Sequence, residues 1–193
     1  MADSYHHGNL RAVLLDAARD LLTEGGVAAL SLRELARRVH VSPAAPYNHF
    51  RDKAELVTAL VQDGLARLDL ESSEAVAQVN DPREKLRALG VAYIRFAVAH
   101  PAQFRIMFRP ELSHPPAVSD LEHGPVFGVL MKVVDELGAS HTLAHDRLTT
   151  AITAWSLVHG LAALLVDGPL QPLAQDRQQV DQLAQAVTAQ LLI

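Results

Sequence analysis

Between Val41 and Lys53 the sequence reads VSPAAPYNHFRDK, and its side chains suit contact with a nucleic acid. Tyr47 and His49 can donate hydrogen bonds to phosphate oxygens, and Lys53 adds a positive charge. Asn48 can hydrogen-bond to the edge of an adenine or to a phosphate. Taken together, these residue types indicate a surface that binds DNA.

The first half of this stretch predicts a short helix. Ser42 is a good N-cap, and Pro43 suits the first helical position. Pro46 has no backbone N–H and biases Ala45 away from the α conformation, so we expect a shortened helix or a 3₁₀-like first turn. Ala44 and Ala45 are small enough to let the backbone approach bases, and their methyl groups can meet thymine methyls.

Two helical segments must position this stretch. GNLRAVLLDAARDLLTEGG has one apolar stripe, and it predicts a helix that Asn9 caps and the Gly25-Gly26 pair ends. Ser31 then caps SLRELARRV, with Glu34 at the capping-box spacing. A tight turn at His40-Val41 joins this second helix to the short one. Two short helices joined in this way fit a helix-turn-helix, whose second helix enters the DNA major groove.

The rest of the chain keeps a helical periodicity and shows no alternating strand pattern of useful length. We expect further helices from Asp52, from Asp81-Pro82, and over AQFRIMF, VFGVLMKVVDELG, AHDRLTTAITAWSLVHGLAALLVDG and AQDRQQVDQLAQAVTAQLLI, with RPELSHPPAVSDLEHGP as a loop. The predicted fold class is all-α. Residues 1–55 form an N-terminal three-helix DNA-binding domain with a helix-turn-helix, and residues 56–193 form a helical-bundle domain.

Charge is unevenly placed along the chain. The formal net charge is −5, yet residues 1–60 hold seven Lys/Arg and seven Asp/Glu and so balance. A strongly basic footprint is therefore absent, and any DNA contact must come from a local patch. The basic residues of that patch are Arg33, Arg37, Arg38, Arg51 and Lys53. Arg37 and Arg38 also fit a solvated helix face, and we expect no base contact from either.

Several classes of function are disfavoured. The chain of 193 residues has no cysteine, which excludes disulfides and thiolate zinc sites and fits the cytoplasm. Its start lacks the layout of a signal peptide, and no run of about 18 apolar residues suggests a membrane span. No Gly-rich phosphate loop, GxSxG elbow or HExxH occurs, so we expect neither an enzyme nor a cofactor.

The stretch from Leu10 to Leu60 resembles the DNA-binding domain of TetR-family (tetracycline-repressor-like) transcriptional regulators. The family pattern stands here as Ser31, Arg33, Leu35-Ala36, Val41-Ser42, Tyr47-Asn48-His49-Phe50 and Lys53. His40 replaces the usual glycine of the turn, so this backbone position must tolerate a side chain. Pro46 replaces a more usual Leu or Ile.

Three features are similar to one subgroup of this family. They are the proline at position 46, the opening YHHG at Tyr5 to Gly8, and a Trp-x-x-x-His-Gly element at Trp155, His159 and Gly160. In this setting the resemblance makes His6 and His7 part of an N-terminal arm near DNA rather than a metal site or a tag remnant.

The resemblance also implies roles for single residues of the DNA-binding domain. The expected phosphate anchors are Ser31, Arg33, Tyr47, His49 and Lys53. The expected base-edge contacts are Ser42, Pro43, Ala44, Ala45 and Asn48. Phe50 is expected to pack inside the domain and to orient the short helix.

For the C-terminal domain, the resemblance implies effector binding and dimerisation through the last two long helices. The sequence supports this, because residues 148–166 are apolar on nearly all sides and the last helix keeps one apolar row, namely Val180, Leu183, Val187 and Leu191. We expect a homodimer, formed near residues 148–166 and 176–192, that binds an inverted-repeat operator. We expect it to repress transcription until a small-molecule effector releases it.

The candidate lining of an effector pocket comes from the large side chains after Phe50. These are Tyr93, Phe96, Met107, Phe127, Met131, Trp155 and His159. Taken singly, each of them is better explained as a core residue, whereas Trp155 and His159, one helical turn apart, could give a pocket its polar groups.

Two alternatives remain open. His141 and His145 are four residues apart and could hold a metal from one helix face, although a loop or an exposed cap explains them better. A helical binding or scaffold protein without sequence-specific DNA affinity would have the same bundle and is the alternative function.

Overall fold

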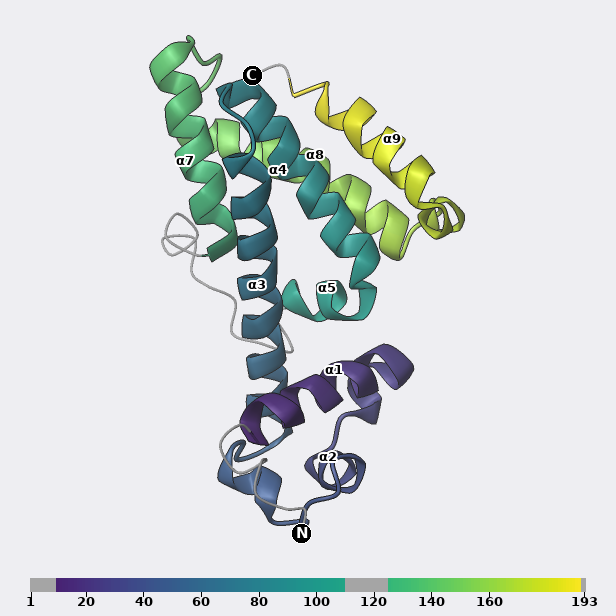
Figure 1. Ribbon diagram of the computed structural model, residues 1–193. Coiled ribbons are helices and arrows are strands. Elements are labelled where there is room, and N and C mark those ends of the chain that lie inside the picture. Colours follow the sequence, from purple (N-terminus) through teal and green to yellow (C-terminus); the bar gives the residue numbers. More distant parts are fainter. Residues whose placement is uncertain (1–9, 110–124, 192–193) are drawn as a thin grey trace. The chain divides into compact units, whose positions relative to one another are not determined.

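The computed structural model describes residues 10–109 and 125–191, and over these ranges the chain consists of helices without a strand (Figure 1). The expected all-α fold is therefore confirmed. The predictions for Tyr5 to Gly8, for the Asn9 cap and for the loop over residues 110–124 lie outside the described residues. The described elements are α1 (Leu10–Ala29), α2 (Leu32–Arg38), η1 (Ala45–Asn48), α3 (Lys53–Ala77), α4 (Pro82–Ala99), α5 (Pro101–Met107), α7 (Pro125–Ser140), α8 (Arg147–Val166), η2 (Gln171–Gln175) and α9 (Arg177–Thr188).

The chain divides into two compact units. Of the described residues, the first unit holds 10–64 and 102–109, and the second holds 65–101 and 125–191. The division expected between residues 55 and 56 stays a prediction. In the structure the first unit extends along α3 to Gly64 and takes in nearly all of α5.

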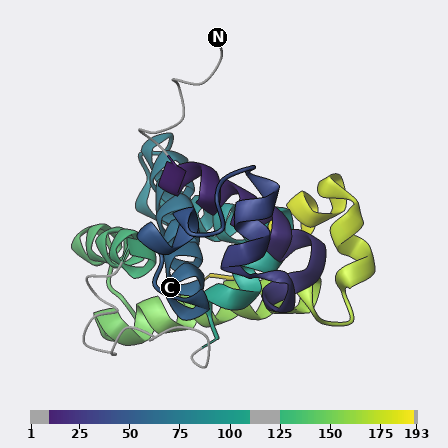
Figure 2. The same ribbon diagram turned by 90° about the horizontal axis from the view of Figure 1, so that it is seen from below.

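In the first unit, α1, α2, η1 and the start of α3 form a cluster around an apolar core (Figure 1, Figure 2). The apolar stripe of α1 is buried there, as its spacing predicts. The glycine pair interrupts α1 as expected: Gly25 has φ −142° and ψ 15°, and Gly26 has φ 65° and ψ −165°. The Gly26 conformation is one that essentially only glycine adopts, and it turns the chain toward Leu30 and α2.

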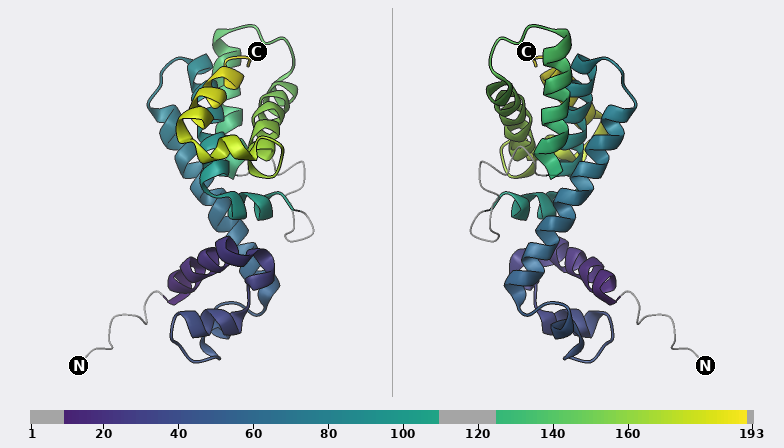
Figure 3. Two further views of the ribbon diagram at one scale, coloured as in Figure 1. Left: turned by 90° about the vertical axis from the view of Figure 1, so that its right-hand side faces the viewer. Right: turned by 90° about the vertical axis from the view of Figure 1, so that its left-hand side faces the viewer.

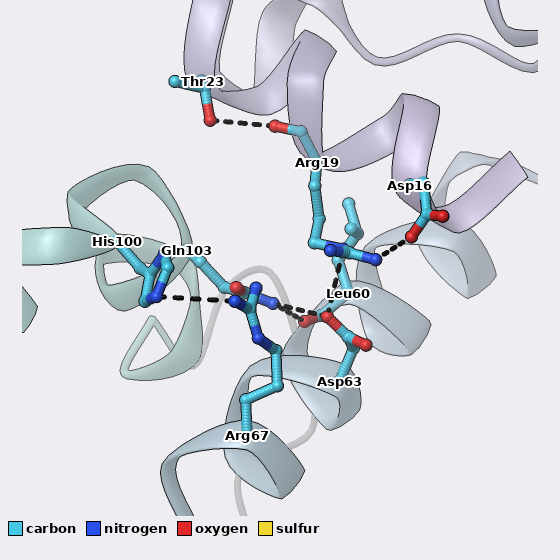
Figure 4. Close-up of polar contacts among 8 residues, drawn as sticks. All are labelled: Asp16, Arg19, Thr23, Leu60, Asp63, Arg67, His100 and Gln103. Carbon is cyan, nitrogen blue, oxygen red and sulfur yellow. Dashed lines mark hydrogen bonds and ion pairs between the residues drawn. The ribbon is translucent and has the colours of Figure 1, made fainter. Parts of the chain in front are cut away.

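A polar cluster fastens α5 to the other helices of the first unit (Figure 4). The side chain of Gln103 is buried, and its Nε2 donates to Leu60 O and to Asp63 Oδ2, both at 3.0 Å. Asp63 Oδ2 also lies 3.3 Å from Arg19 Nε, and Arg19 pairs in turn with Asp16. The carboxylate of Asp63 therefore joins α1, α3 and α5.

In the second unit, α4 is the central helix, and α7, α8 and α9 pack around it (Figure 3). Asp81 caps α4 by accepting hydrogen bonds from the backbone N–H groups of Arg83 and Glu84, and Pro82 occupies the first helical position. The core residues of this unit include Leu86, Leu89, Phe127, Leu130, Met131, Val134, Leu137, Ala151 and Ala154. In the same unit, Arg67 Nη2 donates to His100 Nε2 at 3.5 Å (Figure 4).

The composition of α8 fits a core helix. Among the described residues, α8 is the one helix long and apolar enough to cross a membrane, with a mean hydropathy of 1.5 over its most apolar window. Its residues Ala151, Ala154, Leu161 and Leu165 are buried inside the second unit. Packing against α4, α7 and α9 accounts for this apolar character, and the observation gives no support to a membrane location.

The last helix differs from its predicted role. Its apolar row was expected to face a partner, but Val180 is only 1% exposed and Ala184 is fully buried, because α9 packs on α4 of its own unit. Arg95 Nε donates to Asp181 Oδ1 at 2.6 Å and joins the same two helices. Of the predicted row, Val180 therefore packs inside the protomer, whereas Leu183, Val187 and Leu191 are half-buried and their contact with a partner stays a prediction.

Candidate nucleic-acid interface and effector cavity

The first helix of the helix-turn-helix is built as its sequence indicates. Ser31 has an extended backbone, and its Oγ accepts a hydrogen bond from the backbone N–H of Glu34 at 3.1 Å. Leu32, Leu35 and Ala36 are buried and hold α2 against the core of the first unit. Arg33 lies on the opposite, exposed side of α2.

The turn after α2 is a Schellman motif with a histidine in the position that glycine usually holds. His40 has φ 57°, its N–H donates to Arg37 O at 3.4 Å, and the N–H of Val41 donates to Ala36 O at 3.0 Å. The left-handed conformation confirms that this backbone position must tolerate a side chain. Histidine is one of the residues enriched there, but it adopts this conformation less readily than glycine does.

The segment after the turn is a 3₁₀ helix, η1, rather than a full α-helix. The N–H of Ala45 donates to Ser42 O, that of Tyr47 to Ala44 O, and those of His49 and Phe50 to Pro46 O. Pro46 is buried and lacks a donor, which explains why the α-helical ladder does not form. The expected 3₁₀ conformation is therefore confirmed. The expected cap is wrong, because η1 begins at Ala45 with Ala44 in the N-cap position, so Ser42 does not cap it and Pro43 is not its first residue.

The buried side chain of Phe50 anchors this segment to the first unit. It is 1% exposed, and the guanidinium of Arg11 lies over its ring with Cζ 5.4 Å from the ring centroid. This inward packing agrees with the expected role of Phe50. It leaves the polar residues of the segment on the outside, where Tyr47 is 51% exposed.

Most of the residues predicted to contact DNA are exposed in the first unit. Eight of them are exposed, namely Ser31, Arg33, Ser42, Pro43, Ala44, Tyr47, Asn48 and Lys53, and two are half-buried, namely Ala45 and His49. We call this set the recognition surface. Its residues come from the start of α2, from the turn, from η1 and from the start of α3.

Ion pairs divide the basic residues of the local patch into two groups. Arg37 pairs with Glu34, Arg38 with Glu24 and Arg51 with Glu55, at 2.5, 2.5 and 2.9 Å. Each of these hydrogen-bonded pairs lowers the pKa of its carboxyl group. Arg33 and Lys53, in contrast, have no carboxylate partner within the described ranges. The charges of Arg33 and Lys53 are therefore the ones available to an external anion.

The start of α3 is less suited to binding a phosphate than a helix end with unbonded N–H groups would be. Asp52 Oδ1 accepts the N–H of Glu55, and Glu55 Oε2 accepts the N–H of Arg51, both at 2.9 Å. These carboxylates already bind the exposed N–H groups and add negative charge. Lys53 is therefore the group by which this helix end would attract phosphate.

In the second unit, a cavity of about 30 Å³ lies among α3, α4, α7 and α8. Three of the predicted lining residues meet there: Tyr93 from α4, Phe127 from α7 and Trp155 from α8. Ser72 of α3 also lines this cavity, although nothing in the sequence distinguishes it from other serines on amphipathic helices.

The other candidate lining residues lie elsewhere. Phe96 and Met131 are buried with 0% and 2% exposure but do not line the cavity, because they are packed in the core of the second unit. Met107 belongs to the first unit, where its Sδ approaches Gly64. His159 lies behind the cavity wall, since it contacts Tyr93 rather than the cavity itself.

Tyr93, Trp155 and His159 form a hydrogen-bonded chain beside the cavity. Trp155 Nε1 donates to the Tyr93 oxygen at 3.3 Å, and that oxygen lies 2.7 Å from His159 Nδ1. An indole nitrogen only donates, so the tyrosine oxygen accepts from Trp155, and its O–H can donate to His159 Nδ1. Burial raises the pKa of Tyr93, an effect that the hydrogen bond from Trp155 partly offsets, and burial lowers the pKa of His159. Both shifts favour the neutral forms that this chain requires.

The two histidines considered as metal ligands do not share a helix face. His141 and His145 lie between α7 and α8, and Ser140 Oγ is 3.0 Å from His141 Nδ1. Across residues 10–109 and 125–191, no group of three or more His, Cys, Asp or Glu side chains is placed to hold a metal ion.

A helix-turn-helix followed by a helical unit with a cavity fits the class of DNA-binding transcriptional regulators. Residues 14–60 match the family described as "Bacterial regulatory proteins, tetR family", and residues 86–191 match the family "Tetracyclin repressor-like, C-terminal domain". The chain belongs to the TetR family. It is a regulator and not an enzyme, and the scaffold alternative is disfavoured.

Individual relatives agree with this assignment. The chain is 29% identical over 171 residues to the HTH-type transcriptional activator FasR of Mycolicibacterium smegmatis, covering 86% of this chain and 74% of FasR. A solved structure of a protein of unknown function from Rhodococcus sp. RHA1 is 34% identical and superposes with a TM-score of 0.81, over 98% of this chain and 97% of that one. The fatty acid degradation regulator FadR from Bacillus halodurans shares the fold at 18% identity, with a TM-score of 0.67 over 94% and 97% of the two chains.

Proposed function

We propose that this protein is a homodimeric repressor in the cytoplasm that binds an inverted-repeat operator through the recognition surface and is released by a small molecule. The observation that carries the DNA-binding part is the pairing pattern of the basic patch. Arg33 and Lys53 flank η1 without carboxylate partners among the described residues, whereas Arg37, Arg38 and Arg51 are each held by one.

Each group of the recognition surface has a separate task. Arg33 and Lys53, with the hydroxyl groups of Ser31 and Tyr47 and the ring of His49, bind phosphates and set the register on the duplex. Ser42, Pro43, Ala44 and Asn48 are exposed and reach base edges. Ala45 is half-buried and so contacts bases only through the outer side of its methyl group.

A matched pair of charge-removing variants tests the phosphate contacts. Lys53→Ala removes an unpaired charge, whereas Arg37→Ala removes a charge that Glu34 already neutralises. In gel-shift titrations at several salt concentrations, we expect Lys53→Ala to reduce the magnitude of the salt slope by about 0.9 per subunit, and so by about 1.8 for the dimer. Tyr47→Phe should weaken binding without unfolding the unit. Equal slopes for Lys53→Ala and the wild type would contradict the assignment.

The dimer proposal rests on α8 more than on α9. The exposed side of α8 carries three large apolar side chains, Ile152, Leu157 and Leu164, which are 41%, 36% and 43% exposed. Ser156 and Gly160 lie within the same arc, and a Cβ added at Gly160 would meet no atom within 4 Å. An apolar side with small residues in its middle suits close packing against a second α8. The exposed residues of α9 would complete the contact.

The variant Leu164→Lys tests this dimer face, and Leu70→Lys is its control. Both leucines are exposed in the protomer, at 43% and 59%, so neither substitution should disturb folding. By sedimentation velocity at micromolar concentration, we expect a dimer for the wild type and Leu70→Lys but a monomer for Leu164→Lys. The monomer should also lose affinity for the full operator, because two half-sites about 34–36 Å apart need two linked recognition surfaces. A dimeric Leu164→Lys protein would move the interface elsewhere.

Activation is the second candidate for the regulatory outcome, because the relative FasR is named an activator. The two outcomes differ in the sign of a simple measurement. Deleting the gene should raise transcription from a bound promoter if the protein represses and lower it if the protein activates. The position of the operator relative to the promoter determines whether the protein represses or activates, because a dimer that overlaps the polymerase site blocks polymerase binding.

A further inference from the structure

One buried hydroxyl in the second unit stands apart from the other buried polar side chains. Four polar residues are buried among the described residues, and three have hydrogen-bond partners: Gln103 with Leu60 and Asp63, Thr150 with His145, and Thr188 with Ala184. Ser72 is the fourth. It is 1% exposed, it lines the cavity, and its side chain has no hydrogen-bond partner within the described part of the chain.

A hydroxyl without a hydrogen-bond partner on a residue that is 1% exposed needs an explanation, because a polar group largely removed from water without a new hydrogen bond destabilises the fold. The Oγ of Ser72 is not itself among the fully buried unpartnered atoms, which agrees with its place at the edge of the cavity. A serine inside a helix ordinarily satisfies its hydroxyl with the carbonyl four residues earlier, as Thr188 does with Ala184 O at 2.8 Å. Ser72 forms no such bond and instead borders the cavity. Its hydroxyl is therefore placed to meet a molecule that enters the cavity.

The rest of the cavity wall restricts the charge of that molecule. Apart from Ser72, Tyr93 and Trp155, the wall consists of aliphatic and aromatic side chains and Gly90, and it includes no acidic or basic residue. A charged ligand would lose its hydration there without gaining a counter-charge. His159 lies behind Tyr93, and burial lowers its pKa, so it offers no positive charge near neutral pH.

The polar groups of the wall also differ in what they can offer. The oxygen of Tyr93 is already engaged by Trp155 Nε1 and by His159 Nδ1, at 3.3 and 2.7 Å. A ligand can use Tyr93 only by rearranging that chain of hydrogen bonds. The hydroxyl of Ser72 can donate or accept without breaking any bond to the described residues.

We propose that Ser72 is the hydrogen-bonding anchor of the effector cavity, and that the cavity takes an uncharged, mainly apolar small molecule carrying one hydroxyl or carbonyl group. This inference rests on the proposed function, in which the cavity is the effector site. The cavity of about 30 Å³ has room for only a couple of water molecules, so the ligand must enlarge it on entry. The edge-to-face pair of Phe127 and Trp155, with centroids 5.9 Å apart, is a contact that such a ligand would open.

Three probes with one skeleton test the ligand class: benzyl alcohol, toluene and benzoate. Trp155 is the single tryptophan of the chain and lines the cavity, so its fluorescence reports entry directly. In titrations of the full chain excited at the red edge of the indole band, we expect benzyl alcohol to bind more tightly than toluene and benzoate not to bind. Tighter binding of benzoate, or no response to benzyl alcohol up to its solubility limit, would overturn the assignment.

Two serine variants test the anchor itself. Ser72→Ala should weaken the binding of benzyl alcohol by about 2- to 10-fold, which is the usual contribution of one hydrogen bond, and should leave the affinity for toluene unchanged. Ser73→Ala is the matched control, because this neighbouring serine is half-buried and does not line the cavity. Ser72→Ala should also unfold at the same urea concentration as the wild type or a higher one. An unchanged ratio of alcohol to toluene affinity in Ser72→Ala would refute the role of Ser72.

The same protein preparations separate this inference from the proposed function. Gel-shift titrations with operator DNA report the recognition surface and the dimer without any probe. Intact DNA binding with failed probe binding would refute only the ligand class and the anchor. Probe binding that does not change DNA affinity would instead refute the role of this cavity as the effector site.

Discussion

Two glycine-to-alanine variants should change stability in opposite directions, although neither creates a steric clash. A Cβ added at Gly26 or at Gly128 would meet no atom within 4 Å, so only backbone conformation separates the two sites. Gly26 has φ 65° and ψ −165°, whereas Gly128 lies inside α7. Alanine is strained in the first conformation and favoured in the second.

The magnitudes follow from these conformations. Holding a residue other than glycine in the Gly26 region costs about 1–3 kcal/mol. Alanine also restricts the unfolded chain, which returns about 0.4–1 kcal/mol. The difference between these two effects is about 0–2.6 kcal/mol, and we expect Gly26→Ala to lower the free energy of unfolding by about 1.3 kcal/mol, the middle of that range. Gly128→Ala should raise it by about 0.5–1 kcal/mol, because alanine is the better helix former.

Urea unfolding followed by two signals measures both effects. Circular dichroism at 222 nm reports all helices, and Trp155 fluorescence reports only the second unit. If the units unfold separately, Gly26→Ala should move the dichroism transition and leave the fluorescence transition in place. If they unfold together, both transitions should move. A Gly26→Ala variant as stable as Gly128→Ala, or more stable than the wild type, would refute the argument from backbone conformation, because a steric clash is absent at both sites.

Three further predictions use other observations. His40→Gly should stabilise the first unit by about 0.5–1 kcal/mol in urea unfolding, because glycine relieves the φ of 57°, whereas His40→Ala should not. Gln103→Leu should lower the free energy of unfolding by about 1–3 kcal/mol by removing two buried hydrogen bonds, while the exposed control Gln62→Leu stays within about 0.5 kcal/mol. Burial lowers the pKa of His159 below 6.5, so the unfolded chain binds the proton more readily than the folded chain does. The free energy of unfolding should therefore decrease as the pH falls from about 6.5 toward the lower pKa of the folded state. In thermal melts, His159→Gln should reduce this pH dependence.

The local features of the first unit could be predicted because each depends on neighbours in the sequence. A serine cap, a glycine pair and a proline that forces a 3₁₀ turn act within a few residues, and the structure contains all three where expected. The inward packing of Phe50 also follows from its place in a local pattern. Such signals need no knowledge of distant partners.

Features that depend on distant partners could not be predicted in the same way. Met107 and Gln103 look like continuations of the C-terminal helices, yet they pack in the first unit because Gln103 reaches Leu60 and Asp63, about 40 residues earlier. Ser72 has no periodic signal at all, since its role depends on a cavity formed by four helices. The apolar row of α9 was expected to face a partner, and periodicity does not say which surface covers a face: Val180 is buried in the protomer itself, whereas Leu183, Val187 and Leu191 are half-buried, so their contact with a partner stays a prediction.

The two faces of α8 give the proposed mechanism a physical route. Trp155 and Val158 line the cavity on one side, whereas Leu157 and Gly160 are exposed on the other, so adjacent residues of one helix belong to the two sites. A ligand that enlarges the cavity must displace part of its wall, and a displaced α8 would change the surface by which two copies pair. The ligand and the operator then favour different positions of the same helix. Because such coupling is reciprocal, saturating operator DNA should weaken probe binding at Trp155 by the same factor by which the probe weakens DNA binding. Probe binding that operator DNA leaves unchanged would mean that the cavity and the dimer face are not coupled.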